Sequence, residues 1–542
     1  MDAVTSVPQL VNEPVLDYAP GSPERAALEV ALVELGSEQR ELPHTIAGKR
    51  VDGTGRRTAV RQPHAHRKVL GTLRNATVGD AQAAVDAAKA AAPGWRSLAF
   101  DDRAAILLKA AELLSGPWRA RLNAATMLGQ SKTAYQAEID AACELIDFWR
   151  INVHFARDIL AEQPPLNSKG VWNRTDHRPL EGFVYAITPF NFTAIAGNLP
   201  TAPALMGNTV VWKPSPTQQL AAQLTMELLE AAGLPPGVIN LVTGDGINVS
   251  KVALADPDLA GIHFTGSTPT FQHLWAEVGR NLTAYRSYPR IVGETGGKDF
   301  IVAHPSADPD VLRTAMIRGA FEFQGQKCSA ASRAYVPRSL WRRIKADVVA
   351  ITDGLPQGDV TDFGNFMGAV IDDRAFAKHK DAIDRAHATA GIDVIAGGTY
   401  DDSVGYFIRP TVLEIADPTD ESFRTEYFGP ILSVHVFADR DYAKVLDQME
   451  SFAPYGLTGS IIAQDRRAIA EATDRLRFAA GNFYINDKPT GAVVGQQPFG
   501  GGRASGTNDK AGAAQNLLRW TSARSIKETF VPPTSHAYPH MG

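Results

Sequence analysis

The chain has 542 residues, of which 44% are hydrophobic and 21% are charged, and its formal net charge is -5. This composition is typical of a globular protein that can bury a sizeable core. The mild acidity argues against a nucleic-acid partner and against a polybasic membrane surface. Only two cysteines occur, Cys143 and Cys328, which excludes a disulfide framework and favours a reducing compartment. No uninterrupted apolar run approaches the ~18 residues of a membrane span.

The first residues are acidic, and no Lys or Arg precedes Arg25. A secretory signal needs a basic start and an apolar core, and a mitochondrial transit peptide is rich in Arg and poor in acids. The segment fits neither type, so we expect a cytoplasmic protein. A mitochondrial location would require a presequence that has already been removed.

Helices are expected early in the chain. Residues 1–45 are predicted to form an arm followed by a helix, because Ser22 is a suitable N-cap and Gly36 can end the helix. The Ala-rich residues 78–116 predict two helices, separated at Pro93-Gly94.

Strand and helix signals alternate from residue 182 onward. Short apolar runs in 182–244 predict strands, and leucines at helical spacing lie between two of them. A further strand ends at Phe264 and is followed by a helix opened by Thr268. This order predicts an α/β protein with a parallel, doubly wound sheet. The same alternation in 310–480 predicts a second α/β domain, which contains Cys328.

The sequence lacks the motifs of several common enzyme classes. The chain has no Gly-x-Ser-x-Gly nucleophile elbow and no phosphate-binding Gly-x-x-x-x-Gly-Lys-Ser/Thr loop. Its histidines are scattered without an HExxH motif, so no metal site is expected. A Cys-His hydrolase stays open, because its histidine can come from a distant part of the sequence. The remaining candidate groups are the Cys328 thiol, the Glu294 carboxylate in a Gly-rich turn and the Asn191 amide.

Seven short motifs then follow one another in order between residues 188 and 506: TPFNFTA, WKPS, FTGST, GETGGKD, GQKCSA, EYFGP and QQPFGGGRASG. Together they resemble the aldehyde dehydrogenase superfamily. The resemblance implies a Rossmann-like NAD-binding domain, an α/β catalytic domain and a β-hairpin oligomerisation element. The expected divisions are an arm and helix (1–45), an NAD-binding domain (46–160 and 181–297), a catalytic domain (298–519), and an oligomerisation hairpin with a C-terminal strand (161–180 and 520–542).

The resemblance assigns three catalytic roles that chemistry supports. Cys328 is the nucleophile, because a thiolate attacks an aldehyde carbonyl and can leave again from a thioester. Asn191 and the Cys328 amide would stabilise the oxyanion. Glu294 would activate the water that hydrolyses the thioester. A free thiol has a pKa near ~8.5, so the thiolate needs positive potential nearby. The adjacent Lys327 is one expected source, and a helix N-terminus or the bound nicotinamide cation could add to it.

The resemblance also implies that NAD is the cofactor. Lys213 is similar to the lysine that holds the adenosine ribose, and a helix N-terminus after Gly266 is a natural pyrophosphate site. Two positions depart from the common pattern. Pro216 replaces a frequent glutamate, which weakens the preference for NAD over NADP, and Thr295 replaces a leucine. The full expected cofactor set is Thr188, Lys213, Gly266, Ser267, Thr268, Pro269, Thr270, Glu426 and Phe428.

Within the superfamily, FTGSTPTF, ETGGKD, KCSA, TGAVVGQQPFGG and RASGTNDKAG resemble the 1-pyrroline-5-carboxylate dehydrogenases. These enzymes oxidise glutamate γ-semialdehyde to glutamate, the second step of proline catabolism. By this resemblance Ser329, Gly491 and Ala492 anchor the α-carboxylate of the substrate. Phe192 and Phe499 would enclose its aliphatic part.

Other interpretations stay open. The substrate could be another carboxylate-bearing semialdehyde, such as succinate semialdehyde, and the acyl acceptor could be CoA, although Glu294 suits water. From other classes, the chain could be a non-catalytic NAD-binding protein or a cysteine hydrolase. The expected partners are a second copy of the chain, in at least a homodimer, and a separate proline dehydrogenase. No nucleic acid or membrane is expected.

Overall fold

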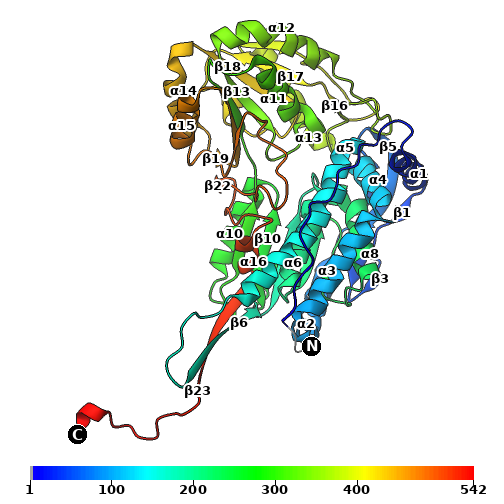
Figure 1. Cartoon of the computed structure of the whole chain (residues 1–542). Coiled ribbons are helices and arrows are strands. Elements are labelled where there is room, and N and C mark those ends of the chain that lie inside the picture. Colours follow the sequence, from blue (N-terminus) through cyan, green and yellow to red (C-terminus); the bar gives the residue numbers. More distant parts are fainter. Residues whose placement is uncertain (1–3) are drawn as a thin grey trace.

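Two seven-stranded sheets, one in each of two lobes, organise residues 4–542, which the computed structural model describes (Figure 1). The first sheet has the order β11-β10-β7-β8-β9-β2-β3. Its strands β7 to β11 are mutually parallel, and β2 and β3 form an antiparallel edge. The bounds are β2 (His44–Ile46), β3 (Lys49–Val51), β7 (Phe183–Thr188), β8 (Thr209–Pro214), β9 (Ile239–Leu241), β10 (Leu259–Thr265) and β11 (Arg290–Glu294).

The crossover helices of this sheet confirm the predicted strand–helix–strand order. Strands β7, β8 and β10 are buried along their whole length, as expected when helices cover both faces of a parallel sheet. The helices are α7 (Thr193–Leu205), α8 (Gln219–Ala232), α9 (Ile247–Ala255) and α10 (Thr268–Arg280). The N-cap of α10 is Ser267 rather than Thr268, and Ser267 accepts a hydrogen bond from the Thr270 amide.

The N-terminal third adds a helical layer and a small sheet of β1 (Arg40–Glu41), β5 (Ala65–Arg74) and β4 (Arg57–Gln62). Ser22 caps the first helix as predicted, but that helix runs through Gly36. The expected break at Pro93-Gly94 is wrong, because α2 continues to Ser97; Trp95 lies buried there and its indole donates to Ala204 O at 2.8 Å. The helices are α1 (Pro23–Ser37), α2 (Val78–Ser97), α3 (Phe100–Ser115), α4 (Arg119–Gln130), α5 (Ala134–Ala137), the π-helix η1 (Glu138–Glu144) and α6 (Leu145–Ala161).

The second sheet has the order β14-β17-β18-β13-β12-β20-β21, parallel except for the edge strand β14. Its strands are β12 (Asp299–Ala303), β13 (Ala331–Pro337), β14 (Ile392–Ala396), β17 (Thr411–Ile415), β18 (Ile431–Phe437), β20 (Thr458–Ile462) and β21 (Asn482–Ile485). Its helices are α11 (Pro309–Phe321), α12 (Arg338–Gly354), α13 (Asp373–Ala388), α14 (Tyr442–Phe452) and α15 (Arg466–Arg475).

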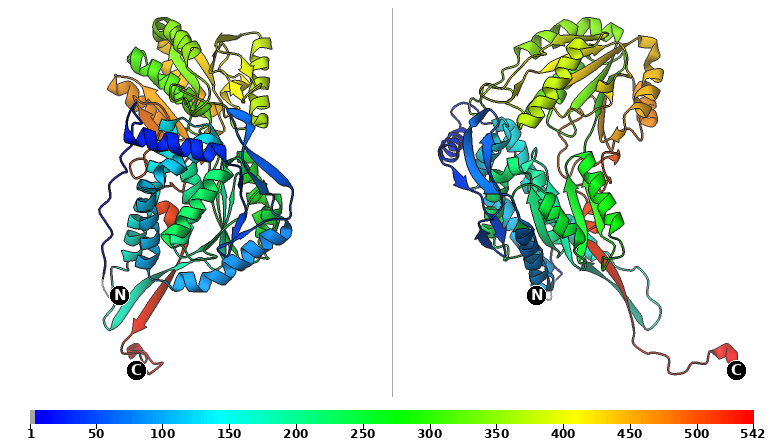
Figure 2. Two further views of the ribbon diagram at one scale, coloured as in Figure 1. Left: turned by 90° about the vertical axis from the view of Figure 1, so that its right-hand side faces the viewer. Right: turned by 180° about the vertical axis from the view of Figure 1, so that it is seen from behind.

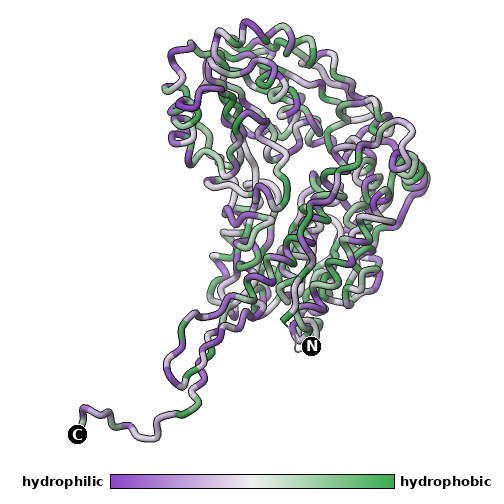
Figure 3. The backbone as a smooth tube through the Cα atoms, in the orientation of Figure 1, coloured by the Kyte–Doolittle hydropathy of each residue, from purple (hydrophilic) through white to green (hydrophobic). Residues whose placement is uncertain are grey.

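The chain leaves this lobe earlier than the expected boundary at residue 519. Val494, Leu517 and Trp520 belong to the same buried cluster as Trp149 and Trp212 of the first lobe. The segment after β21 therefore contributes to the core of the first lobe, although β22 (Gly502–Arg503) still pairs with β19 (Tyr455–Gly456) of the second lobe. Hydrophobic segments run mainly through the interiors of both lobes (Figure 3).

A narrow arm projects from the first lobe (Figures 1 and 2). It consists of β6 (Val171–Pro179) and β23 (Thr521–Thr529), paired antiparallel over their full length. The hairpin expected within residues 161–180 is therefore wrong in detail: β6 takes its partner from the C-terminal strand. An isolated two-stranded ribbon is marginally stable in water. No helix within residues 4–542 has both the length and the apolar character to cross a membrane.

The two sheets meet end to end. Strand β11 ends at Glu294, and residues 295–298 lead directly into β12, which begins at Asp299. The carboxyl ends of the first sheet therefore face the amino ends of the second. Cys328 lies just before β13, at this junction.

Candidate active site

The nucleophile candidate lies in a tight turn between the 3-10 helix η3 (Glu322–Gly325) and β13. Cys328 is partly exposed, whereas Cys143 is buried. The backbone that leads into this turn is strained, with φ of 51° at Phe323 and 55° at Gln324 inside η3, and such backbone is retained mainly at functional sites. The Gln324 side chain holds it by donating to Ser131 O at 2.9 Å and Ala369 O at 2.7 Å.

Asn191 lies beside this turn. It follows β7, is buried, and donates through Nδ2 to Gln326 O at 3.0 Å. A side-chain amide has two N–H groups, so this contact leaves one available as a donor. The structure therefore brings the Asn191 amide to the segment that carries Cys328.

Glu294 closes the site from the end of β11. Its Oε2 is buried and has no hydrogen-bond partner among the described residues. A Cβ at Gly500 would lie 2.9 Å from Glu294 Oε1, so this position requires a small residue. Burial raises the pKa of Glu294 well above its usual value, Lys510 counteracts this, and Asp509 adds to it. A carboxylate so placed suits general-base chemistry.

The expected activation of the thiol by Lys327 is wrong. Lys327 is buried, and its ammonium lies 3.2 Å from Glu322 Oε2, which engages its charge. Burial raises the pKa of the Cys328 thiol well above its usual value, and the nearby Asp299, Glu294 and Glu426 raise it further. The chain alone therefore favours the neutral thiol.

The expected cofactor residues gather at the carboxyl edge of the first sheet. The strand order reverses between β7 and β10, and ligands of doubly wound sheets bind outside the carboxyl ends at such a point. Thr188 ends β7, and its hydroxyl accepts from Trp212 Nε1 at 3.0 Å. Lys213 lies at the same edge on β8. Burial lowers the pKa of Lys213 to about 8, and Asp245 opposes the shift.

The turn after β10 lies beside these strands. A Cβ at Gly266 would meet the Phe264 ring at 2.8 Å, so the turn requires glycine there. The Ser267 hydroxyl lies 2.8 Å from Thr270 Oγ1 and caps α10, whose first turn contains Pro269. These residues shape a helix N-terminus at the switch point, where the aligned amides favour an anion.

Glu426 and Phe428 reach the junction from the second lobe. Glu426 Oε1 accepts from the Gly297 amide at 2.8 Å, and burial raises the pKa of Glu426. Phe428 has φ of 60°, and its ring meets Phe190 edge to face at 5.8 Å between centroids. Both residues thus contact segments that flank the catalytic candidates.

The expected substrate anchor also lies at the junction. Ser329 Oγ is 2.8 Å from Thr490 Oγ1, and Gly491, next in the chain, has φ of 95°. Ala492 follows it directly.

Phe192 and Phe499, which are expected to enclose the substrate, lie in different surroundings. The ammonium of Lys132 covers one face of the Phe192 ring at 3.9 Å from its centroid, so only the other face can meet a substrate. The Phe499 backbone pairs with Ala511, next to Gly500. The structure thus places Phe499 on the segment that adjoins Glu294.

Four charged residues near the site were not identified from the sequence: Lys132, Asp140, Glu144 and Lys510. Burial raises the pKa of Glu144 to about 8, Asp140 adds to the shift, and Lys132 opposes it. Burial also lowers the pKa of Lys132. The π-helical turn that places Asp140 and Glu144 has no signal in hydrophobic periodicity, so sequence reasoning had no means to find them.

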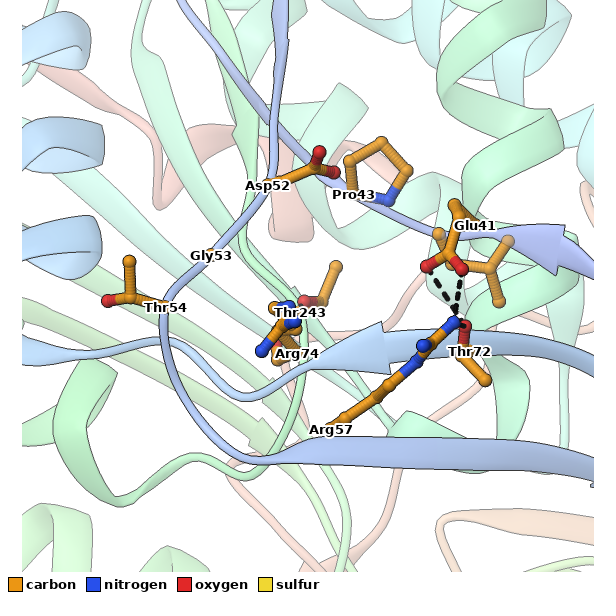
Figure 4. Close-up of a pocket in the computed structure, with 10 residues that line it drawn as sticks. Glu41, Pro43, Asp52, Gly53, Thr54, Arg57, Thr72, Arg74 and Thr243 are labelled. Carbon is orange, nitrogen blue, oxygen red and sulfur yellow. Dashed lines mark hydrogen bonds and ion pairs between the residues drawn. The ribbon is translucent and has the colours of Figure 1, made fainter.

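A separate surface cavity of about 520 Å³ lies away from these residues (Figure 4). It is lined by β1, β4 and β5 and by the loop around Thr243. Arg57 pairs with Glu41 there and also donates to Thr72 Oγ1 at 2.8 Å. Because none of the candidate catalytic residues lines it, this cavity is not the reaction site.

Comparison with known proteins decides the family. Residues 51–526 match the model of the aldehyde dehydrogenase family. The chain belongs to the aldehyde dehydrogenase family. It is 50% identical to a mitochondrial delta-1-pyrroline-5-carboxylate dehydrogenase of Emericella nidulans, over 99% of this chain and 95% of that protein.

Further relatives carry the same description. A mitochondrial delta-1-pyrroline-5-carboxylate dehydrogenase of Homo sapiens is 47% identical over 99% of this chain and 95% of that protein. Among solved structures, the NAD-bound delta-pyrroline-5-carboxylate dehydrogenase of Mycobacterium tuberculosis superposes with a TM-score of 0.97 at 65% identity, and each chain is covered completely. The expected fold class is thereby confirmed.

Proposed function

We propose that the protein oxidises L-glutamate γ-semialdehyde, the open form of 1-pyrroline-5-carboxylate, to L-glutamate with NAD, as the second step of proline degradation. The observation that carries the proposal is the meeting of Cys328, Asn191 and Glu294 at the junction of the two sheets, beside Ser329 and the Gly491 turn. The likeness to an NAD-bound relative over the whole chain supports the choice of substrate and cofactor.

The first chemical step belongs to Cys328. Its thiolate attacks the aldehyde carbon, and the carbonyl oxygen takes up the negative charge. The free N–H of Asn191 and the Cys328 amide stabilise that oxyanion, and one such donor contributes about 3 kcal/mol to transition-state stabilisation. Because the chain alone raises the thiol pKa, a bound cationic ring beside Cys328 would favour the thiolate.

The residues at the carboxyl edge of the first sheet fit NAD. Lys213 and the N-terminus of α10 offer positive potential to its ribose and pyrophosphate, while Glu426 and Phe428 approach from the second lobe. NAD held there would supply the acceptor for the hydride that leaves the substrate carbon, and the acyl group would remain on Cys328 as a thioester. Glu294 then removes a proton from a water molecule, which attacks the thioester carbonyl and releases glutamate and free Cys328.

The substrate class follows from the anchor. A carboxylate three carbons from the aldehyde needs donors near the nucleophile, and the Ser329 hydroxyl with the amides of Gly491 and Ala492 would provide them. The positive φ of Gly491 permits the close backbone approach that such contacts need. The open face of Phe192 and the Phe499 ring would enclose the aliphatic part.

Assembly and location remain predictions. The β6–β23 arm presents unpaired edges, which favours pairing with a second copy into at least a homodimer. A separate proline dehydrogenase would supply the substrate. A cytoplasmic location is the prediction from the sequence, although several relatives are named mitochondrial.

The decisive experiment measures NADH formation from NAD and glutamate semialdehyde, with Cys328→Ala as the matched variant. We expect turnover by the wild type and none by the variant. Succinate semialdehyde, NADP and added CoA test the alternatives in the same assay. Faster turnover of succinate semialdehyde, or formation of an acyl-CoA, would contradict the proposal.

A further inference from the structure

A π-helical turn lies beside the candidate active site. Residues Glu138–Glu144 form the π-helix η1, which interrupts the helical run from α5 to α6. Such turns are rare, and they occur frequently at functional sites because the extra residue re-aims side chains. Here the side chain of Asp140 is fully buried and points to the start of α7.

Asp140 serves as the cap that α7 lacks. Phe192 occupies the N-cap position and makes no side-chain cap bond. Instead, Asp140 Oδ2 accepts from the Thr193 amide at 3.0 Å, and Oδ1 accepts from the Ala194 amide at 2.9 Å. These amides directly follow Asn191 and Phe192, so the carboxylate fixes the loop that carries the oxyanion donor.

Lys132 connects this loop to the nucleophile turn. Its ammonium lies 2.7 Å from Asp140 Oδ2, and neither side chain is exposed. The same ammonium lies 3.9 Å from the centroid of the Phe192 ring and 4.5 Å from that of the Phe323 ring. Phe323 belongs to the strained turn before Cys328, so one cation contacts both halves of the reacting site.

We propose that the Lys132–Asp140 pair is a positioning device that sets the distance between the Asn191 amide and the Cys328 thiol. The inference rests on the proposed function and adds residues that touch neither substrate nor cofactor. A displacement of ~1 Å between reacting groups can cost ~10²-fold in rate. The pair should therefore govern kcat, while the affinity for NAD, most of whose candidate residues lie on β8 and at the start of α10, should not change.

The test compares Asp140→Asn and Lys132→Met with Glu138→Gln. Glu138 lies on the same π-helix and is equally buried, but its side chain contacts α4 and the N-terminal arm instead. For each purified full-length variant we would measure kcat and KM for aldehyde oxidation, NAD affinity by fluorescence, and the thermal unfolding midpoint. A second assay would follow hydrolysis of 4-nitrophenyl acetate, which needs the thiol and the oxyanion donors but no hydride transfer.

We expect Asp140→Asn and Lys132→Met to lower kcat by ~10- to 100-fold, in both assays and with unchanged NAD affinity. Glu138→Gln should lower the unfolding midpoint and leave kcat within ~3-fold of wild type, the range of a residue outside the machinery. If the pair variants lose no more kcat than Glu138→Gln, or lose NAD affinity instead, the inference is wrong.

If the Lys132 or Asp140 variant does not fold, a substitution in the nucleophile turn tests the same link. Phe323→Leu keeps the ion pair and removes only its ring contact with the nucleophile turn, and we expect a loss of up to ~10-fold in kcat. Unchanged kcat would contradict the proposal. Failure of the proposed function has its own signature: a wild type that hydrolyses the ester but forms no NADH from the aldehyde. In that case the ester assay still tests the pair.

Discussion

Two buried carboxylates in the first turn of the π-helix η1, Glu138 and Asp140, have different tasks. Asp140 pairs with Lys132 and binds the loop that carries Asn191, whereas Glu138 pairs with Arg119 and binds the N-terminal arm. Glu138 accepts from the Leu16 amide at 2.9 Å and the Tyr18 hydroxyl at 2.7 Å. Both carboxylates are fully buried, so burial alone does not separate their roles. What separates them is the segment that each one fixes.

This comparison divides the buried charges into two classes. Glu138 and its partners Arg119, Leu16 and Tyr18, here called the Glu138 hub, connect the extended N-terminal arm to α4. This cluster should contribute mainly to the free energy of unfolding. Burial opposes ionisation there, but hydrogen bonds from Arg119 and Leu16 hold the pKa of Glu138 below its usual value. The Asp140 pair ties two catalytic loops together and should contribute mainly to rate.

The largest expected effect on stability comes from Arg119→Met. The change leaves the Glu138 carboxylate buried without its cation, which typically costs about 3–5 kcal/mol. Arg119 also pairs with Glu13 Oε1 at 2.6 Å and donates to Pro14 O at 2.8 Å, so the arm loses two contacts. Urea unfolding should show the loss, while kcat of the folded fraction stays near that of wild type. A fall in kcat as large as that of Lys132→Met would remove the distinction between the two pairs.

Tyr18→Phe probes the same hub with a smaller change. The variant loses the hydrogen bond to Glu138 Oε2 and the bond accepted from Asn123 Nδ2 at 2.9 Å. A hydrogen bond to a charged group contributes about 1.5–3 kcal/mol. We expect a loss in that range by urea unfolding, with unchanged kcat. Stability equal to that of wild type would show that Arg119, Asn123 and Leu16 satisfy Glu138 without the Tyr18 hydroxyl.

The features that could be predicted from the sequence are those encoded by residues close together in the chain. Strand and helix order is local, so the doubly wound sheet and the motif residues Cys328, Asn191 and Glu294 were identifiable. The pairing of β6 with β23 joins residues more than three hundred positions apart, and no local pattern encodes it.

Charge relations were the least predictable part of the site. Adjacency suggested that Lys327 would act on Cys328, but the fold directs its ammonium to Glu322. Lys132 and Asp140 are eight positions apart, and the chain through α5 into the start of the π-helix η1 brings their charges together. Ion pairs depend on where side chains end, which is decided by packing and not by sequence distance.

A third charge, that of the partly buried Lys510, sharpens the comparison because its removal should change the titration of Glu294 and not the position of a catalytic group. It donates to Gly481 O and Gly500 O, each at 2.9 Å, and it opposes the effect of burial on the pKa of Glu294. The other charges that act on Glu294 and Cys328 are those of Asp509, Asp299 and Glu426. Removal of the Lys510 cation should therefore raise the pKa of Glu294 further.

Glu294 acts as a base only when ionised, so the acid limb of thioester hydrolysis should move to higher pH in Lys510→Met. The rate well above that limb should change little. Lys510→Arg keeps the charge and is the matched control, and the acid limb of its pH profile should lie near that of wild type.

The burst of 4-nitrophenyl acetate cleavage reports acylation of Cys328, and the steady state reports hydrolysis. A shift confined to the burst would assign Lys510 to the thiol, whereas no shift in either phase would leave burial alone to set the titration of Glu294.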